Sequence, residues 1–326
     1  MGRRLAVVFA VVAAATSAGC YSYKFSGSMQ TPPPAAKFEA IDLFAYDASV
    51  DVPHRFHGKT EKRDKFTMRE IKWAVKDFPE MKHDHAKGYF YEPADPGGKM
   101  PCLVVLPPTG GPFDLVKGFA EYYAKRGFVV VAMRRRESFF NPDYSIEYNE
   151  FLIRQAVIDA RRAIDYLHAL DYVDKDKTCV MGISLGGIIG ALTMETDARV
   201  KAAGFLVSTG HLSDVLMTSG FGRVAKMREV MMVTYGVGPD ELRDRAEKDL
   251  ARVDPVTYTD RLDPARVVMV NAAFDDILKR EVVMKTREDY GDPQSYFMPL
   301  SHYTSIGFSG YANKKIYRHF ARVLDL

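Results

Sequence analysis

The chain has 326 residues, of which 47% are hydrophobic and 27% are charged, so it is long enough to bury a substantial core. Its formal net charge is +3, and the charge falls to +1 without residues 1–19. So small a charge provides no general attraction to nucleic acid, and three cysteines are too few for a disulfide framework.

The first 20 residues have the order of an export signal. Two arginines precede an apolar run over residues 5–15, and the small residues of TSAGC (16–20) follow. The apolar run is shorter than the roughly 20 residues that cross a bilayer core. Its end resembles a bacterial lipobox, which implies that residues 1–19 are a signal peptide and that Cys20 is acylated. We therefore expect the lipid on Cys20 to anchor the chain to a membrane of the bacterial cell envelope, in the outer membrane facing the periplasm. An ordinary secretory signal is the alternative.

Residues 20–37 are polar and rich in proline, which indicates a tether between the lipid and a domain over residues 38–326. Near the start of that domain, FTMREIKWAV (66–75) alternates loosely between apolar and polar residues, as a strand does. KGYFYEP (87–93) is predicted to be its antiparallel partner.

From residue 102 onward, continuous apolar runs alternate with amphipathic segments. CLVVLP (102–107), for example, is typical of a strand that is buried on both faces. The alternation predicts parallel βαβ units, and hence an α/β fold with a doubly wound, mostly parallel sheet and helices on both faces. The expected strands after the first pair cover residues 102–107, 128–133, 178–181, 202–208, 266–273 and 295–300, and the expected helices cover 113–126, 146–170, a segment from 185, and 310–323.

Residues 211–257 interrupt this alternation. The segment is rich in methionine and charge and is predicted to be largely helical. Because it follows a strand, we expect a small lid over the carboxyl edge of the sheet, where α/β proteins bind ligands. Its methionines either line an acyl pocket or form the core of the lid; they lie at positions 217, 227, 231 and 232.

The stretch TCVMGISLGG (178–187) contains the pattern G-x-S-x-G, with Ser184 between Gly182 and Gly186. A β-branched strand ends directly before the pattern and a helix begins directly after it. This context predicts a tight, strained turn that exposes the Ser184 hydroxyl at the sheet edge. Side chains at the two flanking positions would collide with the neighbouring strand and helix, so glycine is expected there.

These residues resemble the nucleophile elbow of the α/β-hydrolase superfamily, in its dienelactone-hydrolase or bacterial esterase-like branch. The likeness covers residues 65–326 and includes LPPTGGPF, NAAFDD and LSHYTS. It implies an α/β-hydrolase fold with a small helical lid, and a triad in the chain order nucleophile, acid, base. Ser184 matches the nucleophile, and His302, after the last strand, matches the base. His211 is the competing histidine.

The acid is expected just after the strand 266–273, where Asp275 and Asp276 are adjacent. The spacing in the resembled family aligns Ala272 with a small residue and thereby favours Asp275. Consecutive side chains point apart, so only one of the two carboxylates can face His302. The other is expected to cap the next helix.

An oxyanion hole requires two N–H groups directed at the developing negative charge. Leu185 supplies one at the N-terminus of the elbow helix, where the helix dipole also helps. The second is expected from the loop PPTGG that follows the first buried strand. The two prolines of this loop have no N–H, which leaves Thr109, Gly110 or Gly111 as the donor.

Three further features have structural interpretations. The arginines of MRRRES (133–138) are expected to pair with carboxylates, with contact to an anionic substrate as the alternative. HDH (83–85) is interpreted as a polar turn, because a metal site needs a third ligand. Cys102 and Cys179 are expected to be buried thiols at the starts of neighbouring strands, with a bridge between them as the alternative.

Taken together, the motifs predict a serine hydrolase, a carboxylesterase, that cleaves a small-molecule ester through an acyl-enzyme and needs no metal or cofactor. A peptidase or an acyltransferase on the same fold is one alternative. A catalytically silent lipoprotein that uses the fold as a binding surface is another. No nucleic-acid partner is expected, and nothing in the sequence indicates an oligomeric state.

Overall fold

The computed structural model describes residues 42–46, 56–74, 85–95 and 97–326. The expected signal peptide, Cys20 and the tether lie outside these residues, so the predictions made for them remain predictions. None of the helices in the described residues is long and apolar enough to cross a membrane.

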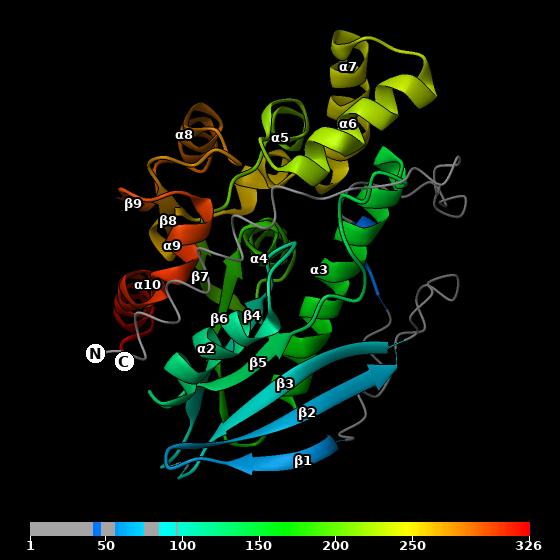
Figure 1. The fold of residues 1–326 in the computed structure, drawn as a ribbon. Helices are drawn as coiled ribbons and strands as arrows, with labels where there is room; N and C mark the ends of the chain where they lie inside the picture. The colour runs from blue at the N-terminus through cyan, green and yellow to red at the C-terminus, as the bar shows by residue number, and fades with distance from the viewer. Residues whose placement is uncertain (1–41, 47–55, 75–84, 96) are drawn as a thin grey trace, which may run out of the picture.

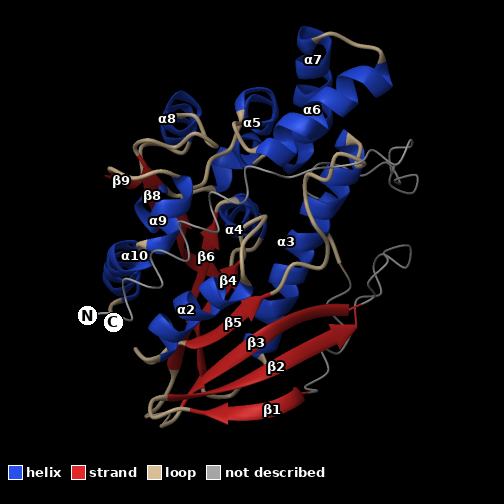
Figure 2. Ribbon diagram, in the orientation of Figure 1, coloured by secondary structure: helices blue, strands red, loops and turns tan. Residues whose placement is uncertain are grey.

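A sheet of nine strands runs through the molecule in the order β1-β2-β3-β5-β4-β6-β7-β8-β9 (Figures 1 and 2). The strands from β4 to β9 pair in parallel, and β1, β2 and β3 add an antiparallel edge. The predicted antiparallel pairing of the first two expected strands is therefore confirmed. The strands are β1 (Phe56–Lys62), β2 (Phe66–Ala74), β3 (His85–Pro93), β4 (Met100–Leu106), β5 (Val129–Met133), β6 (Val173–Ile183), β7 (Val200–Leu206), β8 (Val267–Ala272) and β9 (Gln294–Met298).

Helices cover both faces of the sheet because successive side chains of its buried strands point to opposite sides. Val104 and Leu106 of β4 join a core with α3 and α4, whereas Leu103 and Val105 join a second core with α2 and α10. The helices are α2 (Phe113–Ala124), α3 (Ile146–His168), α4 (Leu185–Thr196), α5 (Leu212–Thr218), α6 (Gly222–Tyr235), α7 (Pro239–Leu250), α8 (Arg280–Asp289), α9 (His302–Gly307) and α10 (Ser309–Leu324). Short 3-10 helices occupy Asp42–Phe44, Ala251–Val253, Pro255–Arg261 and Pro264–Arg266.

The position of β4 within the sheet determines where a site can form. β4 lies between β5 and β6, so the chain adds strands first on one side of β4 and then on the other. At such a reversal the loops at the carboxyl ends diverge and leave a crevice. Leu106 at the end of β4 pairs in register with Gly182 of β6. The loop after β4 and the turn after β6 therefore start side by side.

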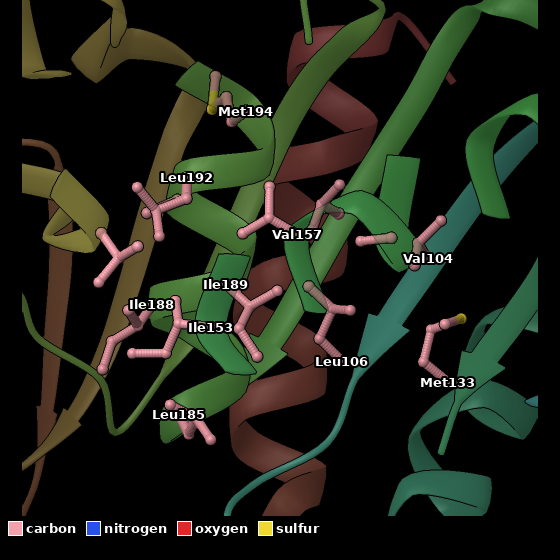
Figure 3. Close-up of a cluster of buried hydrophobic side chains, with 14 of the residues drawn as sticks. Val104, Leu106, Met133, Ile153, Val157, Leu185, Ile188, Ile189, Leu192 and Met194 are labelled. Atoms are coloured by element: carbon pink, nitrogen blue, oxygen red, sulfur yellow. The ribbon is translucent and has the colours of Figure 1, made fainter. Parts of the chain in front are cut away.

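Helix α4 is fixed between the sheet and α3 by its apolar side chains. Leu185, Ile188 and Ile189 are at most 5% exposed and pack in one core with Leu106 of β4 and Ile153 of α3 (Figure 3). Since the side chain of Leu185 is held in the core, the first turn of α4 has a defined orientation relative to the sheet edge.

The segment predicted to be a lid contains α5, α6 and α7, which lie beyond the sheet edge toward which β6 points (Figure 1). Arg245 of α7 pairs with Glu147 of α3 at 2.6 Å and lies over the ring of Tyr235 in α6. These contacts hold the last helix of the segment against the main domain.

The structure differs from the predicted elements mainly in its polar strands. Residues 59–65, KTEKRDK, have mixed charges that predict a solvated surface, and residues 60–65 are exposed. They belong to β1 and its turn into β2, a strand that the sequence did not predict. A charged edge strand has no apolar alternation to reveal it, and such charge is one way in which natural sheets avoid pairing with other chains. β6 begins at Val173, five residues before its predicted start, because its first residues, VDKDK, show no apolar alternation either.

Candidate active site

Ser184 occupies a strained turn between β6 and α4. Its backbone angles are φ 53° and ψ −120°, a region that residues other than glycine rarely adopt. The N–H of Ser184 donates to the carbonyl of Leu206 at 2.8 Å. A Cβ at Gly182 would lie 2.0 Å from the carbonyl oxygen of Gly186, and a Cβ at Gly186 would lie 2.4 Å from that of Leu106. The structure thus provides the collisions with helix and strand for which glycine was expected.

His302 lies next to Ser184 although 118 residues separate them in the chain. Its Nε2 is 3.1 Å from Ser184 Oγ, and its Nδ1 is 2.8 Å from Asp275 Oδ2. The side chains of His302 and Asp275 are each only 3% exposed. An Nδ1–H that donates to the carboxylate leaves Nε2 free to accept the hydrogen bond of the Ser184 hydroxyl.

The loop that carries Asp275 also orients its carboxylate. Asp275 Oδ1 accepts the N–H groups of Ile277 and Leu278, each at 2.9 Å. One carboxylate oxygen is therefore held by the backbone while the other faces His302.

Asp276, the alternative acid, is exposed, and within the described residues no hydrogen bond or ion pair joins its side chain to His302. The expectation that the second aspartate caps the next helix is wrong, because α8 begins only at Arg280 and its N-cap, Lys279, makes no side-chain cap. The backbone carbonyl of Asp276 instead accepts the N–H of Gly220, in the turn between α5 and α6, at 3.1 Å. This contact joins the acid loop to the predicted lid.

His211, the competing histidine, is engaged elsewhere. Its Nε2 lies 2.6 Å from Asp289 Oδ2 at the end of α8, and its own backbone is left-handed with φ 52°. His168 bonds Thr178 at 2.7 Å and His319 accepts from Arg322, so both are structural side chains. Of the eight histidines, His54 and His83 lie outside the described residues.

The two backbone regions predicted to form an oxyanion hole are the start of α4 and the loop after β4. Leu185 begins α4, and no acceptor within the described chain takes its N–H. On the other side, a Cβ at Gly186 would also lie 2.8 Å from the carbonyl oxygen of Pro107, so the loop after β4 lies against the first turn of α4. Thr109 and Gly110 belong to that loop.

Comparisons with known proteins give the fold a name. No protein-family model matches the chain. An uncharacterized peptidase of Bacillus subtilis is 33% identical over 156 residues, which are 48% of this chain and 57% of the relative. An uncharacterized protein of Pseudomonas aeruginosa is 27% identical over 165 residues, which are 47% of this chain and 41% of the relative. The chain thus spans about half the length of the curated relatives it matches.

Solved structures align with more of the chain. Acetyl xylan esterase 1 from Thermoanaerobacterium sp. aligns with a TM-score of 0.63 and 16% identity over 90% of this chain and 96% of that chain. An acetyl xylan esterase from Paenibacillus sp. R4 has a TM-score of 0.63 and 15% identity over 90% and 97%. An acylaminoacyl peptidase from Pyrococcus horikoshii has a TM-score of 0.56 and 16% identity over 80% and 42%. The chain has the α/β-hydrolase fold.

Within the α/β-hydrolase fold, the three arginines after β5 behave differently from one another. Arg134 pairs with Glu70 at 3.6 Å, and Arg136 pairs with the buried Asp159 at 3.5 Å, as expected for salt-bridged arginines. Arg135 does not follow the expectation, because it donates to backbone carbonyls of the loop after β4. Every residue has a backbone carbonyl, whatever its side chain. The sequence therefore contains no signal for this contact.

The methionines of the predicted lid contribute to its core. Met227 and Met231 are buried and line a small apolar cavity with Ile153 of α3 and Leu216 of α5. Neither Ser184 nor His302 lines this cavity. The other two methionines, Met217 and Met232, are partly buried against the same core.

Cys102 and Cys179 are free, buried thiols on the neighbouring strands β4 and β6. Burial raises the pKa of Cys102 to about 12, so its thiol is unreactive at neutral pH. No group of three or more His, Cys, Asp or Glu side chains that suits a metal ion occurs within the described ranges, which include only His85 of the HDH stretch.

Proposed function

We propose that the protein is a serine hydrolase that cleaves carboxylic esters. The observation that carries this proposal is the continuous hydrogen-bonded series from Ser184 through His302 to Asp275, which starts at a serine in a strained turn. A serine hydroxyl is a weak nucleophile on its own, and it requires a base within hydrogen-bond reach and a third group that orients the base. The three side chains meet both requirements.

In the proposed reaction, Ser184 Oγ attacks the ester carbonyl while His302 Nε2 takes the hydroxyl proton. Asp275 remains ionised and stabilises the imidazolium that forms. The negative charge on the carbonyl oxygen is stabilised by the N–H of Leu185 and by one N–H of the loop after β4. The alcohol leaves with the proton from His302, and water then releases the acid by the same steps in reverse.

Esters are the proposed substrate class because acetyl xylan esterases align over 90% of the chain. A peptidase activity is the second candidate, since a curated relative from Bacillus subtilis is named as an uncharacterized peptidase and a structural neighbour is an acylaminoacyl peptidase. The same triad attacks either carbonyl, so the choice depends on the leaving group that the site accepts.

A fluorophosphonate probe and two substrate series test this proposal. The wild-type protein is expected to become labelled at Ser184, and Ser184→Ala is expected to remain unlabelled and to lose roughly 10⁴- to 10⁶-fold in turnover. The p-nitrophenyl esters of increasing chain length should be hydrolysed faster than aminoacyl p-nitroanilides. Faster anilide cleavage would favour the peptidase, and a wild-type protein without labelling or turnover would contradict both candidates.

We also propose that the lipid on Cys20 anchors the enzyme to the membrane. The support is the order of the first 20 residues alone: basic, apolar, small and then cysteine. Cys20→Ala should release the protein into the soluble fraction of the producing cells. An unchanged membrane fraction for this variant would contradict acylation at Cys20.

A further inference from the structure

The guanidinium of Arg135 bridges two loops at the carboxyl edge of the sheet. Arg135 follows β5, and its side chain extends to the loop after β4. Nη1 donates to the carbonyl of Pro108 and, at 3.2 Å, to that of Gly110, while Nη2 donates to that of Gly111 at 3.3 Å. Among the ion pairs of the described residues, none joins Arg135 to a carboxylate.

This arrangement has an energetic cost that the neighbouring arginines avoid. Arg134 and Arg136 each face a carboxylate, whereas Arg135 places its charge near two other guanidiniums. Burial and the charges of Arg223 and Arg134 lower the pKa of Arg135 from its usual value. A cation kept here with only carbonyl acceptors indicates that the position has a role other than charge pairing.

The loop after β4 depends on this side chain for its hydrogen bonds. Within the described chain, no backbone hydrogen bond joins residues 107–111 to another segment. Its composition, PPTGG, supplies two prolines without an N–H and two flexible glycines. The contacts from Arg135 are therefore the interactions that fix the orientation of its peptide planes.

Because the peptide bond is planar, a contact that fixes the direction of a carbonyl also fixes the direction of the N–H in the same peptide. The carbonyl of Pro108 and the N–H of Thr109 belong to one trans peptide, so they point in opposite directions. A guanidinium that binds this carbonyl directs the N–H of Thr109 away from itself and also polarises it. The peptide that contains the N–H of Gly110 has no such contact with Arg135. The N–H of Gly111 shares its peptide with the carbonyl of Gly110, which Arg135 also binds, but it lies two residues further from β4 than that of Thr109.

Thr109 is also the first residue after β4 that has an N–H, and the loop just before it lies against Gly186 in the first turn of α4. We infer that Arg135 is a positioning residue, which holds the N–H of Thr109 as the second oxyanion donor beside that of Leu185. This inference rests on the proposed function, because an oxyanion donor has a role only if Ser184 attacks a carbonyl.

The test compares Arg135→Ala and Arg135→Lys with the control Arg134→Ala on a p-nitrophenyl ester. Loss of one oxyanion donor lowers kcat roughly 10²- to 10³-fold, so Arg135→Ala is expected to lose about 10²-fold in kcat while KM changes less than about threefold. Lysine should restore only part of this loss, because an ammonium cannot span three carbonyls. Added guanidinium ion should partly rescue the alanine variant. Arg134→Ala should stay within about threefold of the wild-type protein.

A second measurement excludes a merely structural role. The affinity for a boronic acid, which mimics the tetrahedral intermediate, should fall in parallel with kcat/KM in Arg135→Ala. Thr109→Pro removes the proposed donor, and its combination with Arg135→Ala should be little worse than Thr109→Pro alone, since both changes act on one N–H.

Three outcomes would overturn the inference: a loss in Arg135→Ala no larger than in Arg134→Ala, a loss confined to KM, or full additivity with Thr109→Pro. Arg135→Lys serves as the test variant if the alanine variant does not fold. Labelling of wild-type Ser184 by the fluorophosphonate distinguishes a failure of this inference from a failure of the proposed function. If the wild type is labelled and these results appear, the inference alone fails, whereas an unlabelled wild type contradicts the proposed function itself.

Discussion

The two sides of Ser184 are built from different chemical groups. On the side of β8 and β9, the site consists of two buried side chains, His302 and Asp275, whose partners are 2.8 to 3.1 Å away. On the side of β4 and β5, the proposed oxyanion hole consists of backbone, and the side chain of Arg135 binds three carbonyls of the loop after β4.

The two sides are also held in place differently. The carboxylate of Asp275 is oriented by N–H groups two and three residues later in its own loop. The loop after β4 is oriented from a different strand, through a side chain that lies 24 to 27 residues away. The carboxylate of Asp275 is therefore oriented by its own loop, whereas the hydrogen bonds of the loop after β4 come from one distant side chain.

The largest effect is expected on the side built from side chains. Asp275→Asn should lower kcat/KM by roughly 10³- to 10⁴-fold, because an amide favours the wrong tautomer of His302 and cannot stabilise its protonated form. Asp276→Asn is the matched control and should change kcat/KM less than about threefold. Ester kinetics on both variants check the assignment, and a larger loss at position 276 would reverse it.

A substitution at Gly186, which contacts the end of β4, tests the side of Ser184 that is built from backbone. Gly186→Ala would place a Cβ 2.4 Å from the carbonyl oxygen of Leu106, and backbone on both sides leaves little room to yield. We expect a loss of roughly 1 to 3 kcal/mol in the free energy of unfolding, together with a lower kcat, because the loop after β4 must move. Denaturant unfolding and ester kinetics measure the two effects. Wild-type values for both would show that the contact between loop and helix is unimportant.

The buried ion pair of Arg136 and Asp159 predicts that the free energy of unfolding depends on pH. Burial raises the pKa of Asp159 from 3.8 to about 6, since desolvation outweighs the attraction of Arg136. The folded protein therefore holds a proton that the unfolded chain releases, and stability from this group is complete below pH 3.8 and is lost as pH rises through about 6.

Asp159→Asn lacks this titration. Relative to the variant, the wild-type free energy of unfolding should fall by about 2 to 3 kcal/mol between pH 3.8 and a pH above 6. Denaturant titrations of both proteins at the two pH values provide the difference. A constant difference, or one of opposite sign, would show that the ion pair with Arg136 dominates.

The smallest expected effect concerns a glycine with no neighbour to collide with. Gly118 lies on the exposed side of α2, the helix that follows the loop after β4, and a Cβ there would meet nothing within 4 Å. Gly118→Ala should raise the free energy of unfolding by roughly 1 kcal/mol through helix propensity, with unchanged ester kinetics. A destabilised variant would mean that α2 needs flexibility at this point.

Most of the fold could be predicted because buried parallel strands leave a strong pattern. Runs such as CLVVLP and FVVVAM are apolar on both faces, and the helices between them have one apolar side. The charged edge strand β1 could not be predicted, since neither of its faces carries an apolar row. Helix α9 is also absent from the prediction, because its six residues are too few to show a period.

By itself, the sequence determined the turn at Ser184 and the order of the chemical groups, since glycines on both sides of a serine and a histidine after the last strand can be recognised without coordinates. Only the tertiary structure shows that Asp275 rather than Asp276 contacts His302, because consecutive side chains diverge and the loop alone sets which one faces the imidazole. It also shows which carbonyls Arg135 binds, since every residue type offers the same backbone carbonyl and such an acceptor is identified only by its position in space.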